Sequence, residues 1–119
     1  MADIRPFAAL RPRPGLEQRI AALPYDVVSR SEAEEAVREE PLSFLSIDRA
    51  ETGFPREVPA DDPRVYRRAA ALLSEWMADG SMIQDEEAHY YIYSQTWRGR
   101  MQTGITAVAS IDDYESGVI

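Results

Sequence analysis

The stretch DPRVYRRAAALLSEWMADG, residues 62–80, gives the strongest secondary-structure signal in the chain. Asp62 is a favourable N-cap, and Pro63 takes the first helical position, where its missing amide hydrogen costs nothing. Gly80 suits the left-handed backbone that ends many helices. Apolar side chains recur at the helical period at Val65, Tyr66, Ala69, Leu72, Leu73, Trp76 and Met77. The pattern predicts an amphipathic helix over residues 63–79.

The next strong pattern is HYYIYSQTWRGRMQTGITAVAS, residues 89–110. It is rich in aromatic and β-branched residues, which favour strands, and Arg98-Gly99 is a turn signal. The pattern predicts a β-hairpin near 89–110. A hairpin beside an amphipathic helix indicates an α+β fold with a mixed or antiparallel sheet. We expect the helix 63–79 and a shorter helix 32–40 to pack on that sheet.

The shorter helix is predicted from Ser31, a natural N-cap, with Glu34 at the capping-box spacing. The stretch LSFLSID, residues 42–48, has β character and is interpreted as a buried strand that ends at Asp48. Residues 49–62 carry glycine and prolines and are interpreted as a long loop.

The length of 119 residues suits one domain, so we expect a single α+β domain over 1–119. The final stretch IDDYESGVI, residues 111–119, shows no terminal element or cap. We therefore expect the chain to be an N-terminal fragment of a longer protein.

Composition narrows the class of protein. The chain has no cysteine, which excludes disulfides and cysteine-ligated metals. Its net charge of −8 makes nucleic-acid binding unfavourable, because a nucleic-acid site needs a basic surface. No apolar run is long enough to span a membrane, and MADIRPF at 1–7 is not a secretory signal, so a cytoplasmic location is expected.

Ligand-binding candidates are found where the chain bends. The stretch IAALPYDVVSRS, residues 20–31, places Tyr25 and Asp26 directly after a proline. The bend is either a purely structural turn or a surface that presents both side chains to a ligand. Asp48 follows the predicted strand, and strand ends are where open sheets place ligand groups. The alternative is that aspartate ends a strand simply because it favours turns.

Arg98 and Arg100 flank the predicted hairpin tip and could bind an anion such as phosphate; the alternative is that they only add charge. No glycine-rich phosphate loop is present. The single histidine, His89, has no metal-ligand spacing around it. The residues therefore identify no metal site and no catalytic group.

Several blocks occur in an order that resembles a known family. They are IRPFAALRP, LPYDVVSRSEA, PLSFLSIDR, AAALLSEWMADG with QDEEAHYYIYSQTWRGR, and GITAVASIDDYESGVI. Together they are similar to the uncharacterised bacterial and archaeal family catalogued as domain of unknown function 1015. The resemblance covers essentially the whole chain. Family members are longer, which agrees with an N-terminal fragment.

The resemblance also suggests candidate functions. Longer members are loosely described as ParB-like, and their downstream region resembles the Asp-Gly-His-His-Arg stretch of ParB-like free-serine kinases. That stretch is absent here. The first hypothesis is the N-terminal part of a nucleotide-dependent phosphotransferase acting on a small metabolite, with ATP or ADP and magnesium bound only by the full-length protein. The second is a non-catalytic structural or interaction module that contacts the remainder of its own chain or forms a homodimer. ParB-like DNA binding is disfavoured by the acidic charge.

Overall fold

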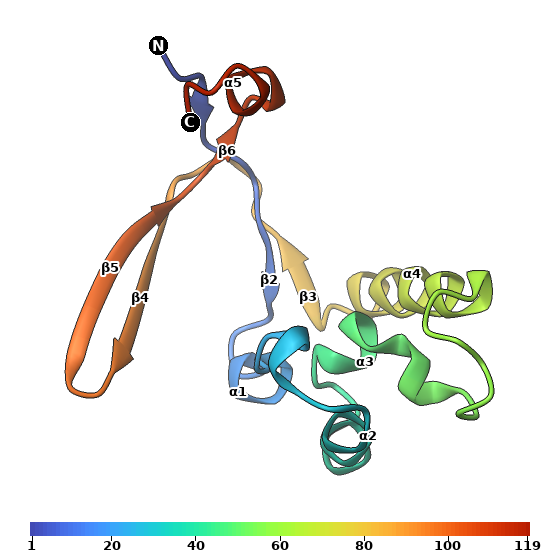
Figure 1. The fold of residues 1–119 in the computed structure, drawn as a ribbon. Helices are drawn as coiled ribbons and strands as arrows, with labels where there is room; N and C mark the ends of the chain where they lie inside the picture. The colour runs from blue at the N-terminus through green and yellow to red at the C-terminus, as the bar shows by residue number, and fades with distance from the viewer. The chain divides into compact units, whose positions relative to one another are not determined.

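The computed structural model describes residues 1–119 and shows an α+β chain with helices and short antiparallel strands (Figure 1). The chain forms two compact units. Unit 1 contains residues 1–10 and 84–119, and unit 2 contains residues 11–83. Strand β2 (Leu10–Pro12) pairs with β3 (Met82–Gln84), and the chain passes between the units along these two strands.

Unit 2 is helical. Its elements are α1 (Glu17–Ile20), η1 (Tyr25–Val27), α2 (Arg30–Glu39), α3 (Leu45–Asp48), η2 (Ala50–Gly53) and α4 (Pro63–Ala78). Helix α4 packs against α3 and η2, and α2 packs against the same two elements. The buried apolar side chains of this unit are Ile20, Ala33, Leu45, Ala50, Val65, Trp76 and Met82.

The longest helix confirms its sequence signals. The Asp62 carboxylate accepts a hydrogen bond from the Arg64 amide at 2.8 Å, and Pro63 occupies the first turn. Gly80 adopts a φ of +82°, the left-handed conformation that an L-residue rarely takes. Val65 and Trp76 of the apolar stripe are buried, whereas Tyr66 and Met77 remain exposed. The helix packs against α3 and η2, two segments that the sequence pattern predicted to be a strand and a loop.

The strand predicted over 42–48 is wrong, because this segment forms a turn followed by the short helix α3. The two serines satisfy local backbone groups. The Ser43 hydroxyl accepts from the Leu45 amide at 3.3 Å, and the Ser46 hydroxyl donates to the Pro41 carbonyl at 2.9 Å. Such local bonds compete with a strand ladder. The predicted 49–62 loop begins with the 3-10 turn η2.

Helix α2 begins two residues before the predicted start. Ser29, not Ser31, is the N-cap: its hydroxyl accepts from the Glu32 amide at 3.1 Å, and Glu32 accepts from the Ser29 amide at 2.9 Å. Both serines have a glutamate three residues later, so spacing alone could not choose between them.

Unit 1 is built around the hairpin of β4 (Tyr91–Trp97) and β5 (Arg100–Thr106), which confirms the predicted hairpin. Its turn residues Arg98 and Gly99 both have positive φ, +50° and +76°, as a two-residue type I′ turn requires.

The segments that flank the hairpin pair separately. Strand β1 (Ile4–Arg5) is antiparallel to β6 (Val108–Ala109), so the end of the predicted hairpin belongs to another ladder. The expectation of no terminal element is also wrong, because α5 (Ile111–Glu115) follows. Asp113 in α5 accepts a hydrogen bond from the Asp3 amide at 2.6 Å, which connects this helix to the N-terminal strand.

Candidate functional site

The Pro-Tyr-Asp bend of unit 2 is stabilised by an arginine that lies far from it in sequence. The Arg49 guanidinium donates to the carbonyl oxygens of Tyr25, at 3.1 Å, and Val28, at 2.8 Å. It also pairs with the carboxylate of Glu51 at 2.6 Å. Both side chains of the pair are largely buried, with 18% of Arg49 and 7% of Glu51 exposed. The bend is therefore fixed through its backbone, which leaves its side chains free.

Those side chains point outward. Tyr25 is 59% exposed, and its apolar neighbours Leu23 and Val27 are exposed to a similar degree. Asp26 is exposed as well and does not cap α2, whose N-cap is Ser29. Tyr25 and Asp26 thus form an outward-facing surface rather than a buried turn.

Asp48 ends α3 and directly precedes Arg49, so the Arg49 hydrogen bonds bring its segment beside the bend. Its carboxylate makes no hydrogen bond or ion pair. Although the residue is exposed overall, partial burial of the carboxyl raises the pKa of Asp48. A partly desolvated, unpaired carboxylate costs stability, and such groups cluster at functional sites.

The hairpin carries the other two predicted site residues, Arg98 and Arg100. Its register places alternate side chains on two opposite sides. Side A comprises Tyr91, Tyr93, Gln95 and Trp97 of β4 with Arg100, Gln102, Gly104 and Thr106 of β5. Side B comprises Ile92, Ser94 and Thr96 with Met101, Thr103 and Ile105. Both sides are exposed: Trp97 on side A is 68% exposed, and Ile92 and Ile105 on side B are 77% and 74% exposed.

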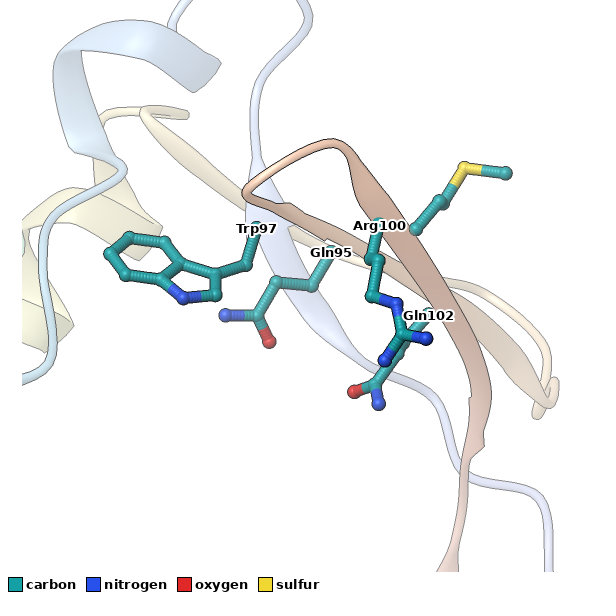
Figure 2. A pocket seen from close by; sticks show the side chains of 5 residues that line it. Gln95, Trp97, Arg100 and Gln102 are labelled. Carbon is teal, nitrogen blue, oxygen red and sulfur yellow. The ribbon is translucent and has the colours of Figure 1, made fainter.

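Side A bears an open hollow of about 590 Å³ near the hairpin tip. It is lined by Gln95, Trp97, Arg100 and Gln102 of side A, and by Met101, which alternation places on side B. The labelled side chains project from the two strands around this hollow (Figure 2). A second hollow of about 380 Å³ continues along the hairpin past Tyr93 to Gly104, where the lack of a side chain leaves space.

The chemistry of side A suits a planar or anionic group. Trp97 offers an aromatic face, the paired amides of Gln95 and Gln102 can both donate and accept, and Arg100 supplies a fixed positive charge. Residues 91–106 include no acidic residue. Arg98 is placed differently, because its guanidinium carbon lies 5.5 Å from the centre of the Trp97 ring in a cation–π contact.

Unit 2 has a hollow of its own, about 290 Å³, between α2, α3, η2 and α4. Its lining is Val37, Pro41, Leu42, Ser46, Ala50, Thr52, Gly53, Arg68, Leu72, Glu75 and Trp76. Most of these side chains are apolar, and one cation and one anion stand among them. Sequence patterns did not single out this hollow, because it is assembled from four elements.

The predicted site residues therefore fall into two groups. Tyr25 and Asp26 lie on the bend to which the Arg49 guanidinium is bonded, and Asp48 precedes Arg49 in the sequence, whereas Arg98 and Arg100 belong to unit 1. None of the three hollows described above is lined by Tyr25, Asp26 or Asp48. The sequence did not single out Arg49, whose carbonyl partners Tyr25 and Val28 lie 24 and 21 residues away, nor did it single out Gln95 and Gln102. The alternation of the hairpin could have placed both glutamines on the side of Trp97.

No group of three or more histidine, cysteine, aspartate or glutamate side chains is arranged to hold a metal ion. None of the helices has the length and apolar character needed to cross a bilayer.

Comparison with known proteins gives one match. Searches of the curated proteins and of the solved structures found no significant similarity. A family model described as "Protein of unknown function (DUF1015)" matches residues 4–119, nearly the whole chain, including both units and the Pro-Tyr-Asp bend. The chain therefore belongs to the DUF1015 family.

Proposed function

We propose that this chain is an interaction module, the N-terminal part of a longer protein, which docks against the remainder of its own polypeptide through side B of the hairpin. The observation that carries the proposal is the exposure of Ile92 and Ile105, which face each other across the two strands. Met101 adds a third exposed apolar side chain to the same side. An isolated two-stranded hairpin is marginally stable in water, so this one needs a packing partner.

Side B fits an intramolecular partner by its chemistry. It carries no charged side chain, and its other members are serine and threonine. A surface with this composition resembles the core-facing side of a sheet more than the polar surface of a monomer. A homodimer would cover it too, but dimer formation depends on concentration, whereas a covalently attached partner does not.

The test compares amide hydrogen exchange of residues 91–106 in this chain and in the longer protein. We expect fast exchange in the chain alone and protection in the longer protein. Replacing both isoleucines, Ile92→Thr with Ile105→Thr, should remove the protection while keeping β-branched side chains. The matched control on side A, Gln95→Thr with Gln102→Thr, should leave it unchanged.

Two results contradict this proposal. Full protection of residues 91–106 in the monomeric chain would show that the hairpin needs no partner. Protection that increases with protein concentration would identify a homodimer instead.

A second candidate function rests on side A. We propose that the longer protein is a nucleotide-dependent phosphotransferase acting on a small metabolite, and that side A binds the nucleotide. The supporting observation is the combination of Trp97, two amides and Arg100 on an element without acidic residues. Trp97 would stack on the base, and Arg100, with Arg98 beside it, would meet a phosphate. Tyr25, Asp26 and Asp48 are the candidates for contacts with a metabolite or magnesium.

The direct test incubates the longer protein with ATP or ADP, magnesium and a panel of amino acids and sugars, and follows phosphorylated product. We expect product with at least one metabolite, and ADP should quench the fluorescence of Trp97 in this chain. Arg100→Gln should weaken ADP binding about tenfold, while Arg5→Gln, a cation elsewhere in unit 1, should not. Absence of product and of ADP binding would reject the phosphotransferase.

A further inference from the structure

The hollow of unit 2 has opposite charges on one stripe of α4. Arg68 and Glu75 both line it, and they are seven residues apart, two helical turns. Their Cα atoms are therefore separated by about 10 Å along the helix axis. Leu72 lies between them on the same stripe and lines the hollow as well. The charges flank an apolar strip.

Neither charge is neutralised by the protein. Arg68 and Glu75 make no hydrogen bond or ion pair, and both are exposed. Their own helix offers no partner, because no acidic residue stands three or four positions from Arg68 and no basic residue stands so near Glu75. Other arginines of this unit are paired: Arg30 with Glu34, and Arg64 with Asp62.

The polar groups inside the hollow are already partly engaged. The Ser46 hydroxyl donates to the Pro41 carbonyl at 2.9 Å, and the Thr52 hydroxyl donates to the Arg49 carbonyl at 2.8 Å. Each hydroxyl has used its hydrogen and offers only lone pairs to the hollow. The remaining lining is apolar, with the ring of Trp76 almost fully buried. The hollow can thus contact a methylene chain and accept hydrogen bonds.

We propose that this hollow binds a small zwitterion whose ammonium and carboxylate groups are separated by an apolar chain, that is, an ω-amino acid. The carboxylate pairs with Arg68, the ammonium with Glu75, and the methylene chain lies along Leu72 and Trp76. An α-amino acid, whose two charges are adjacent, cannot face both ends of the strip. A volume of about 290 Å³ suits a ligand of this size. This site goes beyond the proposed function and does not depend on it.

The test uses a series of probes that differ in chain length. Glycine, γ-aminobutyrate, ε-aminocaproate and the eight-carbon ω-amino acid are titrated into the intact chain by calorimetry. Binding should rise with length to an optimum above glycine. Hexanoate and hexylamine, which each lack one charge of ε-aminocaproate, should bind about tenfold more weakly or worse.

NMR locates the binding. The indole N–H resonance of Trp76, in the hollow, should shift on titration, and that of Trp97, in the other unit, should not. Arg68→Gln and Glu75→Gln should each reduce affinity about tenfold, while Arg67→Gln, the same change at the neighbouring exposed position of α4, should leave it unaltered.

Four outcomes overturn the proposal. The first three are no binding by any zwitterion of the series, affinity independent of chain length, and equal loss of affinity in the Arg67→Gln variant. Equal binding of hexylamine and ε-aminocaproate would show that Arg68 plays no part, and would also overturn it.

Discussion

The guanidinium of Arg49 donates a hydrogen bond to the carbonyl oxygen of Tyr25 across twenty-four positions of sequence. This contact connects the Pro-Tyr-Asp bend to the segment that follows α3. It places the largely buried Arg49–Glu51 ion pair against the backbone of the bend. The bend therefore owes its shape to a distant side chain, and Tyr25 and Asp26 remain exposed to solvent.

Replacing Arg49 by methionine tests this arrangement. Arg49→Met leaves the buried Glu51 carboxylate unpaired and frees two carbonyl oxygens, so we expect a loss of about 3 kcal/mol in the free energy of unfolding, measured with urea. The double variant with Glu51→Gln should recover part of that loss. Arg56→Met, which removes an exposed arginine that pairs with Glu34, is the control and should change little. Equal effects at both positions would contradict the role given to Arg49.

Asp48→Asn should stabilise the chain at neutral pH. Burial raises the folded-state pKa of Asp48 above its ordinary value, so the ionised carboxylate opposes folding. As pH falls through that raised pKa, the wild-type side chain takes up a proton and this penalty disappears. The advantage of the asparagine variant should therefore be largest at neutral pH and vanish in acid. Thermal unfolding from neutral pH down to about pH 3 measures it, and a constant difference would be inconsistent with a raised pKa.

The start of α2 gives a matched pair of variants. Ser29→Ala removes the N-cap and should lower the free energy of unfolding by about 1 kcal/mol. Ser31→Ala changes the residue that sequence spacing favoured, and it should cost much less because Ser31 only accepts a hydrogen bond from the exposed Arg56 side chain. Urea unfolding of both variants decides between the two caps.

Asp62 should make α4 sensitive to acid. Hydrogen bonds from the Arg64 side chain and amide lower the pKa of Asp62 to about 2. Its stabilisation is complete above the unfolded-state pKa near 3.8 and is lost as pH falls towards about 2. Asp62→Asn keeps a cap without titrating, so the variant should lose less helicity than the wild type across that interval. Far-UV circular dichroism measures the difference, and identical acid profiles would refute this role.

Elements with strong local signals were predictable from sequence. Helix α4 has a cap, a proline and a glycine at the expected positions, and the hairpin has Gly99 at its turn, where φ is positive. The segment 42–48 was not predictable, because a short apolar run suits a strand or a buried helix equally, and the two serines decide for the turn and helix through local bonds.

The candidate site residues also differ in how far a local sequence pattern could predict them. Sequence indicated Tyr25 with Asp26 at the bend and Asp48 separately, and only the tertiary hydrogen bond from Arg49 to the Tyr25 carbonyl connects the two segments. The opposite charges of Arg68 and Glu75 are visible in the sequence, but the apolar hollow between them requires four elements to come together. Residues that act through distant partners leave no local pattern to detect.

The pairing of Ile4 with Ala109 has a consequence for the order of folding. Unit 1 is discontinuous in sequence, because the whole of unit 2 is inserted between its first ten residues and its hairpin. The β1–β6 ladder must therefore close a very long loop, and loop closure is an entropic barrier that slows non-local strand pairing. If unit 2 folds first, it brings residues 11 and 83 together and shortens that loop. On that order of events unit 2 acts as an internal nucleus, and we expect the pairing of β1 with β6 to be the late step.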